Sequence, residues 1–474
     1  MFEDHLDTEC ACVVGGAGLA GMGFLFNALK TGVLPQLCRD GLIVVDASDR
    51  PGVGSLGQYR ITANSVGDVF IDCLRDPRLA SIFEPLEYSP AYWRIRRQAD
   101  SAPPLAEVGE LMAEAHRLVL EHIVKHFGVR IWHSTAITAV TWQPGEVHLL
   151  VETAGFERRI RCRALVLNLG GRQTPQHLCA GLAAHGLSLP AAADVLGSDV
   201  LLRMNAVQIR ERLVPVLAAG RRISVIGGSH SAFSVLENLA DALEFAGLQE
   251  LTLIHRNPVR LFYECAEQAH AQGYDFDAQR DVCPVSGRIN RSGGLRYRAQ
   301  QIGREVLHNG RVGKTGVTVR RAQLQGGAPA DLELAAQALG ESGAVIQCTG
   351  YQPVLPQLYH ADDTSIQLRQ ANGGLDANAQ GCPQDQDGRR LDGIYLFGIG
   401  AGLAPDPQLG SEQAFEGRIY GVWQFHHTAS SAVLEAVLAR VQRLARKPEP
   451  ARPSLVQTLD ERMHLLLPGL SGKV

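Results

Sequence analysis

Several kinds of chemistry are missing from this 474-residue sequence. Its ten cysteines are scattered, and no Cys-x-x-Cys or Cys-x4-Cys pair follows the first glycine cluster, which argues against a dithiol–disulfide reductase. No group of His, Cys and carboxylate residues has the spacing of metal ligands, so we expect no metal site. No tail carries a strong run of charge and the net charge is −4, so we expect no nucleic-acid partner.

Two further absences concern membranes and export. No run is long and apolar enough to span a membrane. The first residues are acidic and lead almost at once into a predicted strand, which does not fit a signal peptide. We therefore expect a cytoplasmic protein. With 474 residues, 45% of them hydrophobic and 20% charged, the chain should be globular and contain two or three domains.

A glycine cluster near the start has the pattern Gly16-x-Gly18-x-x-Gly21. An apolar strand, a helix and a second apolar strand are predicted around it, at 12–15, 22–30 and 42–45. The second strand ends in Asp46. In such a unit Gly16 permits a sharp turn, Gly18 lets a pyrophosphate approach the backbone, and Gly21 lets the helix pack on the strand. The helix N-terminus would meet the phosphates, and Asp46 would bind ribose hydroxyls.

The segment 50–74 follows the acid-bearing strand and should pass along the bound dinucleotide. It is too rich in glycine for a helix and too polar for a buried strand. Gln58, Arg60, Asn64 and Ser65 could hydrogen-bond a cofactor ring there. The alternative is an ordinary loop whose side chains satisfy their own backbone.

The opening pattern returns in a relaxed form at Gly227-x-Ser229-x-x-Ala232, with His230 inside it. A helix and a strand at 251–254 follow, and the strand leads to Arg256 where the first unit has an acid. An acid at that place suits a free ribose 2′-hydroxyl, whereas an arginine suits a 2′-phosphate. The second unit therefore predicts an NADPH site. The alternative is that Arg256 is merely a charge at a strand end.

Other elements follow from periodicity. A helix is predicted over 105–127, and another over about 430–446. Strands at 129–132, 136–142, 147–152 and 159–163 predict a small antiparallel meander. Buried strands that end in glycines are predicted near 164–171, 344–350 and 393–400. Ser411 is predicted as the N-cap of a helix that continues to Trp423.

Residues 262–315 interrupt the alternation of strands and helices and look like an insertion. The insertion contains Arg288, Arg291, Arg296 and Arg298. Insertions at the carboxyl edge of a parallel sheet commonly lie over the ligand crevice, so this one is a candidate lid or substrate-facing element. Its arginines, and those of a basic patch at 94–97, would suit an anionic substrate or a phosphopantetheine arm. The alternative is a surface excursion without a role.

Taken together, these motifs resemble the flavoprotein monooxygenases with two dinucleotide-binding domains. Gly16, Gly18, Gly21 and Asp46 match the FAD fingerprint of that family, and Gly227, Ser229 and Ala232 match its looser second fingerprint. The stretch Cys348-Thr349-Gly350-Tyr351 is similar to the Ala-Thr-Gly-Tyr segment of N-hydroxylating monooxygenases. Gly398 resembles the second FAD-contact turn, although Gly400 stands where the family usually has Asp. The Phe-x-Gly-x-x-x-His signature of Baeyer–Villiger enzymes and the Trp-His-Gly-Met segment of siderophore amine hydroxylases are absent, which indicates a divergent, class B-like branch.

The resemblance implies an α/β fold with a glutathione-reductase-like FAD domain and an inserted NADPH domain. The implied divisions are 1–204 and 345–446 for FAD, 205–344 for NADPH, and a tail at 447–474. FAD contacts are implied for Gly16, Gly18, Gly21, Asp46, Gln58, Gly398 and Ser411, and NADPH contacts for Gly227, Ser229, His230, Ala232 and Arg256. Arg60, Asn64 and Ser65 are the candidate catalytic residues.

The implied activity is an NADPH- and FAD-dependent monooxygenase of secondary metabolism. Its C4a-(hydro)peroxyflavin would oxygenate a small or carrier-protein-bound substrate with O2, by N-hydroxylation or by Baeyer–Villiger insertion. The main alternative is an NADPH-dependent flavin reductase that passes electrons to a quinone or another acceptor. A non-enzymatic FAD scaffold is a third reading, and the presence of two intact nucleotide-binding motifs argues against it. A homo-oligomer is compatible with all three readings.

Overall fold

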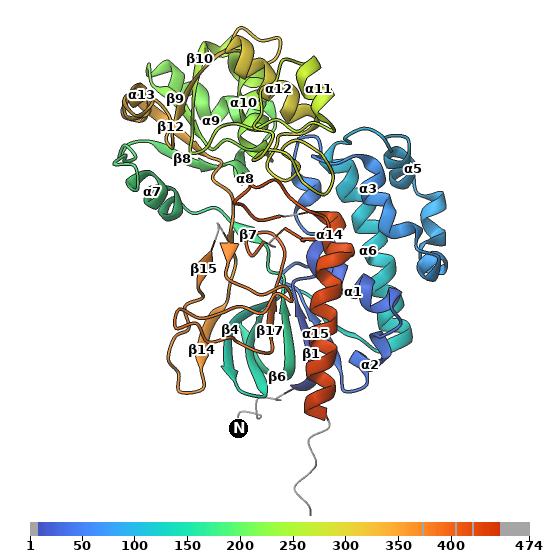
Figure 1. The fold of residues 1–474 in the computed structure, drawn as a ribbon. Helices are drawn as coiled ribbons and strands as arrows, with labels where there is room; N and C mark the ends of the chain where they lie inside the picture. The colour runs from blue at the N-terminus through green and yellow to red at the C-terminus, as the bar shows by residue number, and fades with distance from the viewer. Residues whose placement is uncertain (1–7, 372–373, 403–404, 420, 446–474) are drawn as a thin grey trace, which may run out of the picture.

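Two sheets organise the chain in a computed structural model, which describes residues 8–371, 374–402, 405–419 and 421–445 (Figure 1). The first sheet has the strand order β14-β4-β5-β6-β1-β2-β3, and β17 pairs with β6. Its parallel part contains β1 (Thr8–Gly15), β2 (Leu42–Val45), β3 (Arg130–Trp132), β6 (Phe156–Leu167) and β17 (Ile394–Leu396). The remaining strands are β4 (Thr135–Gln143), β5 (Glu146–Thr153) and β14 (Gln357–His360).

The predicted antiparallel meander is present as β4, β5 and β6. Two details differ from the prediction. The strand predicted at 129–132 is β3, which pairs in parallel with β2 and lies outside the meander. In addition, β6 is a single strand from 156 to 167 where we expected two. Its first half pairs with β5 and is largely exposed, while its second half pairs with β1 and is buried. No turn residue separates the halves, so the strand continues from the meander into the centre of the sheet.

The second sheet is entirely parallel, with the order β11-β10-β9-β12-β8. Its strands are β8 (Asp194–Gly197), β9 (Arg222–Ile226), β10 (Glu250–His255), β11 (Thr318–Gln323) and β12 (Ser342–Gln347), and its larger helices are α9 (Ala206–Ala218), α10 (His230–Leu243), α12 (Tyr297–Asn309) and α13 (Pro329–Glu341). The sheet thus extends on both sides beyond 205–344. Two sheets of this kind confirm the predicted α/β class with two Rossmann-like units.

Long helices cover the first sheet, and short elements are distributed over both parts of the chain. The long ones are α1 (Leu19–Lys30), α6 (Leu105–Phe127) and α15 (Thr428–Ala445). The short ones are α2 (Leu34–Cys38), α3 (Gly67–Ile71), α4 (Ala80–Phe83), α5 (Pro90–Arg96), α7 (Pro175–Ala183), α8 (Ser198–Leu201), α11 (Ala266–Ala271), α14 (Val422–His426), β7 (Gly171–Arg172), β13 (Gln352–Pro353), β15 (Gln370–Ala371) and β16 (Gly374–Leu375). The helix predicted over 105–127 is present as α6, and Gly128 ends it with a φ of +65°. The helix predicted near 430–446 is present as α15, while residue 446 and the tail at 447–474 lie outside the described residues.

The helix predicted from Ser411 to Trp423 is wrong. The described residues of this stretch are irregular until α14 begins at Val422. The reason is tertiary, since the carboxylate of Glu412 accepts hydrogen bonds from the backbone N–H groups of Ser292 and Gly293 in the insertion. Contacts with a distant segment therefore replace the helical turn that the local sequence favours.

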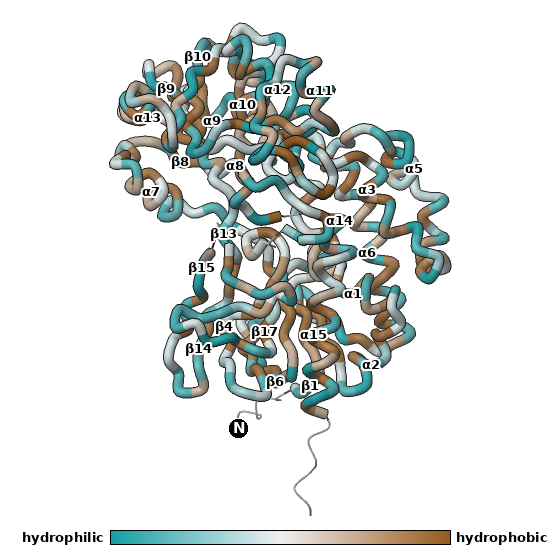
Figure 2. The backbone as a smooth tube through the Cα atoms, viewed as in Figure 1, coloured by the Kyte–Doolittle hydropathy of each residue, from teal (hydrophilic) through white to brown (hydrophobic). Residues whose placement is uncertain are grey.

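No helix in the described part of the chain is both long and apolar enough to cross a membrane. Within the same residues, no group of three or more His, Cys, Asp and Glu side chains could hold a metal ion. The apolar residues instead line the interior, and Figure 2 shows hydrophobic segments concentrated around β1 and α15. The centre of β1 is fully buried, as are Phe24 and Met22 of α1.

Two histidines are buried within this core, where they link α6 and α14 to α1. The rings of His116 and His426 both pack on Phe26. Nδ1 of His116 donates to the carbonyl of Gly52 at 2.5 Å, and Nδ1 of His426 donates to that of Val422 at 3.0 Å. Neither Nε2 atom has a hydrogen-bond partner. Burial lowers the pKa of His116 to about 4 and that of His426 to about 3, so both rings are neutral.

We predict that acid destabilises the protein through these rings. Their pKa values in the folded protein lie below the ordinary value of 6.5, so the unfolded chain binds more protons under acidic conditions. The contribution of the two neutral rings to the free energy of unfolding is fully present above pH 6.5 and decreases as the pH falls toward 4. His116 alone accounts for about 3 kcal/mol of this decrease. Denaturant unfolding of His116→Gln between pH 7 and pH 4 should show a weaker pH dependence. His126→Gln, on the exposed side of α6, is the control, and an equal slope in both variants would contradict the prediction.

Candidate active site

The first glycine turn connects β1 to α1. Gly16 has a φ of +86°, and a Cβ atom there would lie 2.4 Å from the carbonyl oxygen of Asn168. A Cβ atom on Gly21 would lie 1.9 Å from the carbonyl oxygen of Gly16, so α1 packs directly on the turn. Gly18 differs, because a Cβ atom there would meet nothing within 4 Å. The turn is therefore closed on the protein side and open where a ligand would approach.

Asp46 and Gly398 lie beside this turn. Asp46 directly follows β2, and its carboxylate accepts hydrogen bonds from the backbone N–H groups of Ala17 (2.6 Å) and Ser48 (2.8 Å). Gly398 follows β17 with a φ of +108°, and a Cβ atom there would lie 3.0 Å from Cβ of Ala20 on α1. No side chain caps α1, so its first N–H groups are available to a ligand. The structure thus brings these two predicted residues to the N-terminus of α1.

The four predicted residues of the segment 50–74 lie in different surroundings. Gln58 ends a short 3-10 turn, Leu56–Gln58, that packs against α6. Arg60 reaches the turn after α8, because its backbone N–H donates to the carbonyl of Leu202 at 2.9 Å and its Nε to that of Arg203 at 3.2 Å. Asn64 is exposed and Ser65 is half-buried. No hydrogen bond among the described residues joins Arg60 to either of them.

The second glycine turn connects β9 to α10. A Cβ atom on Gly227 would lie 2.3 Å from the carbonyl oxygen of Cys348. Ser229 is the N-cap of α10 without a capping side-chain hydrogen bond, and Ala232 is buried. His230 Nε2 accepts the backbone N–H of Arg296 at 3.0 Å, and burial lowers the pKa of His230 to about 4. The neutral ring therefore carries its proton on Nδ1, as a hydrogen-bond donor at the start of α10.

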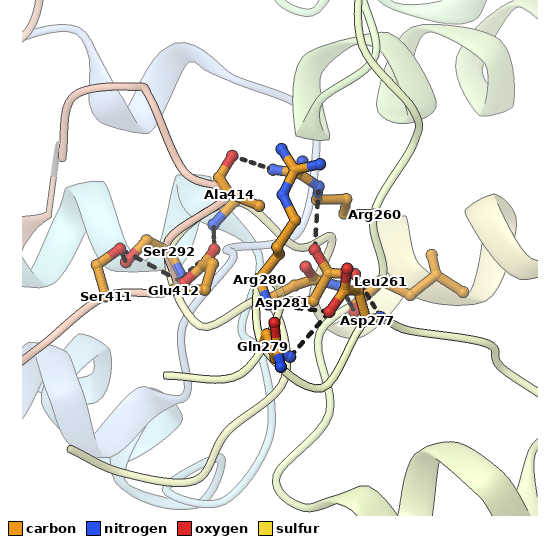
Figure 3. Close-up of polar contacts among 12 residues, drawn as sticks. Arg260, Leu261, Asp277, Gln279, Arg280, Asp281, Ser292, Ser411, Glu412 and Ala414 are labelled. Carbon is orange, nitrogen blue, oxygen red and sulfur yellow. Dashed lines mark hydrogen bonds and ion pairs between the residues drawn. The ribbon is translucent and has the colours of Figure 1, made fainter. Parts of the chain in front are cut away.

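Arg256 and Ser411 complete the predicted set. Arg256 directly follows β10 and is exposed, and its side chain has no hydrogen-bond or ion-pair partner in the described ranges. Ser411 is not a helix N-cap, since its hydroxyl donates to the hydroxyl of Ser292 at 2.8 Å (Figure 3). Ser411 therefore faces the insertion.

A polar cluster that the sequence reasoning missed joins the two sheets. The hydroxyl of Tyr59 donates to the carboxylate of Asp199 and lies 3.4 Å from the hydroxyl of Tyr351. Arg203 donates to Asp199 at 2.8 Å, and its guanidinium carbon lies 5.0 Å from the centre of the Tyr59 ring. Burial raises the pKa of both tyrosines, so they remain protonated. The only available signal was Tyr351 in its Thr-Gly-Tyr stretch.

No protein-family model matches the chain. The CMP-5'-(3-aminopropyl)phosphonate hydroxylase of Streptomyces rubellomurinus is 31% identical over 445 residues, which cover 91% of this chain and 98% of that protein.

Solved structures show the same fold at low sequence identity. The ornithine N-hydroxylase of Kutzneria sp. 744 has a TM-score of 0.51 at 15% identity and covers 91% of this chain and 99% of its own. The reduced ornithine hydroxylase of Pseudomonas aeruginosa has a TM-score of 0.51 at 14% identity, with 92% and 100% covered. The cadaverine monooxygenase of Erwinia amylovora, bound to FAD, has a TM-score of 0.50 at 13% identity, with 92% and 96% covered. The chain therefore belongs, with the Streptomyces hydroxylase, to the FAD- and NADPH-dependent flavoprotein monooxygenases with two dinucleotide-binding domains.

Proposed function

We propose that the protein N-hydroxylates the amine of an aminoalkyl phosphonate that is carried on a nucleotide. The observation that carries this proposal is the 31% identity to the CMP-5'-(3-aminopropyl)phosphonate hydroxylase, which extends over nearly all of both chains. The substrate in that name contains an amine and no ketone, which favours N-hydroxylation over Baeyer–Villiger insertion. The Cys348–Tyr351 stretch, similar to a segment of N-hydroxylating enzymes, supports the same choice.

The first turn is the proposed FAD site. Gly16 and Gly21 close the turn against the protein, while the open space at Gly18 and the uncapped N-terminus of α1 suit a pyrophosphate. Asp46 is the proposed ribose ligand, and Gly398 lets the chain after β17 approach the same place. Gln58, on the loop after β2, is proposed to contact the flavin side.

The second turn is the proposed NADPH site. Gly227, Ser229 and Ala232 form the turn, and His230 presents an Nδ1–H donor at the N-terminus of α10. Arg256, exposed beyond β10, has the charge that a ribose 2′-phosphate requires.

When bound, NADPH and FAD would supply the redox chemistry, namely a hydride for the flavin and a reduced flavin that can react with O2. The residues of the chain must then hold the amine and exclude water. We propose Arg60 as a positioning residue, because its hydrogen bonds to Leu202 and Arg203 hold the 50–74 loop against the turn after α8. Asn64 and Ser65 are proposed to contact the substrate or the flavin, since neither side chain is engaged in a hydrogen bond among the described residues.

The first test is product analysis with CMP-5'-(3-aminopropyl)phosphonate, NADPH and air. We expect NADPH consumption and formation of a hydroxylamine, measured by a colorimetric assay, to rise together with substrate. The same nucleotide phosphonate without its amine is the matched control and should yield no hydroxylamine. Rapid NADPH oxidation that reduces quinones, with no hydroxylamine from the amine, would favour the reductase instead.

The second test concerns the choice of nicotinamide cofactor. Arg256→Leu should raise the Kd for NADPH in flavin reduction by about tenfold to a hundredfold, because one or two charge-assisted hydrogen bonds are lost. Its Kd for NADH should not change. Arg311→Leu, on an exposed arginine before the start of β11, is the matched control. Equal effects on NADPH and NADH would show that Arg256 does not contact the 2′-phosphate.

The third test concerns the first turn. Gly18 has φ −71° and ψ −168°, an extended conformation that valine adopts easily, and its Cβ position is free of protein atoms. Gly18→Val should therefore fold but lose most of its FAD, measured by flavin absorbance per protein. Gly181→Val, at another glycine whose Cβ position is free, is the control. Full flavin content in Gly18→Val would place the pyrophosphate elsewhere.

A further inference from the structure

Two arginines of the insertion have no carboxylate within ion-pair distance among the described residues. Nη2 of Arg296 donates to the carbonyl of Arg291 at 2.5 Å, and its guanidinium carbon lies 3.8 Å from the centre of the Phe262 ring. Nη1 of Arg291 donates to the carbonyl of Gly410. Burial lowers the pKa of Arg296, and the like charges of Arg288 and Arg291 act in the same direction, while Glu264 opposes them.

The neighbouring arginines and the neighbouring acid are already paired. Arg288 forms an ion pair with Glu264 at 2.7 Å, and Arg298 forms one with Glu237. Glu412 is only 2% exposed, and its carboxylate accepts from the backbone N–H group of Ser292 at 2.9 Å (Figure 3). It also accepts from the backbone N–H group of Gly293 at 2.8 Å. Neither Arg291 nor Arg296 therefore forms an ion pair with a carboxylate in the described part of the chain.

The position of this pair connects both cofactor units. The backbone N–H of Arg296 donates to His230 at the start of α10, beside the second glycine turn. Arg291 contacts Gly410 in the segment 405–419, which follows the turn after β17. An anion between these elements would relieve the repulsion between the two guanidinium groups, and a tetrahedral phosphonate can accept hydrogen bonds from both of them.

We propose that Arg291 and Arg296 bind the phosphonate group of the substrate and so hold its amine between the two cofactor units. This inference rests on the proposed function, because it names the part of the substrate that the insertion recognises. The phosphate groups of NADPH are also anions, and the proposed NADPH site lies at the N-terminus of α10, close to Arg296. The experiment therefore distinguishes binding of the substrate phosphonate from binding of NADPH.

The experiment uses the FAD-loaded variants Arg291→Gln and Arg296→Gln, with Arg298→Gln as the matched control on α12. For CMP-5'-(3-aminopropyl)phosphonate we expect kcat/KM to fall at least tenfold in the two variants and to stay within twofold in the control. The Kd for NADPH in anaerobic flavin reduction without substrate should not change. Arg296→Lys should recover part of the loss, since it retains the charge without the fork of donors.

A weaker Kd for NADPH with unchanged kcat/KM for the amine would overturn the proposal and assign the pair to NADPH. Unchanged values of both quantities would overturn it as well. Equilibrium dialysis with labelled methylphosphonate measures binding of the anion directly and does not require the enzyme to turn over. If the wild-type enzyme binds methylphosphonate and Arg296→Gln does not, the anion site stands even where the nucleotide substrate is not hydroxylated, and only the proposed function fails. Equal binding by both would overturn the site.

Discussion

The two connections between the sheets are the constraint on which the rest of the structure depends. The chain leaves the first sheet through β7 and returns through β13, and these short strands pair with each other, Gly171 opposite Pro353 and Arg172 opposite Gln352. The side-chain amide of Gln173 adds a hydrogen bond to the carbonyl of Gln347 at 3.1 Å. The paired connections lie between the two sheets in Figure 1. Hydride transfer needs the two cofactors in contact, so the link that holds the sheets together is also a condition for the reaction.

Further links tie the sheets together away from these connections. Arg60 binds the carbonyl groups of Leu202 and Arg203, and the Tyr59 hydroxyl binds Asp199, so the loop after β2 is attached to α8 and the turn that follows it. The backbone of the insertion, in turn, encloses the carboxylate of Glu412. In the proposed anion site, Arg291 and Arg296 would connect the packing of the insertion to the choice of substrate.

Sequence patterns predicted those features of the fold that depend on residues close together in the chain. The glycine turns, the acid after β2, the meander and α6 with its terminal Gly128 were readable because spacing alone specifies them. The helix from Ser411 failed because Glu412 binds a segment more than a hundred residues away, which no periodicity records. The Tyr59–Asp199 contact was missed for the same reason. The residues of β12 predict an apolar strand before a glycine, and this pattern fits either sheet. The place of β12 beside β9 could therefore not be predicted from its own residues.

The central claim is that this chain transfers one oxygen atom of O2 to the amine nitrogen of a nucleotide-linked phosphonate. The most direct measurement is mass spectrometry of the product formed under isotopically labelled O2, with fragmentation to locate the label. The account predicts one labelled oxygen on the amine nitrogen and none on the nucleotide or the propyl carbons. A product whose added oxygen comes from water, or lies on carbon, would contradict it.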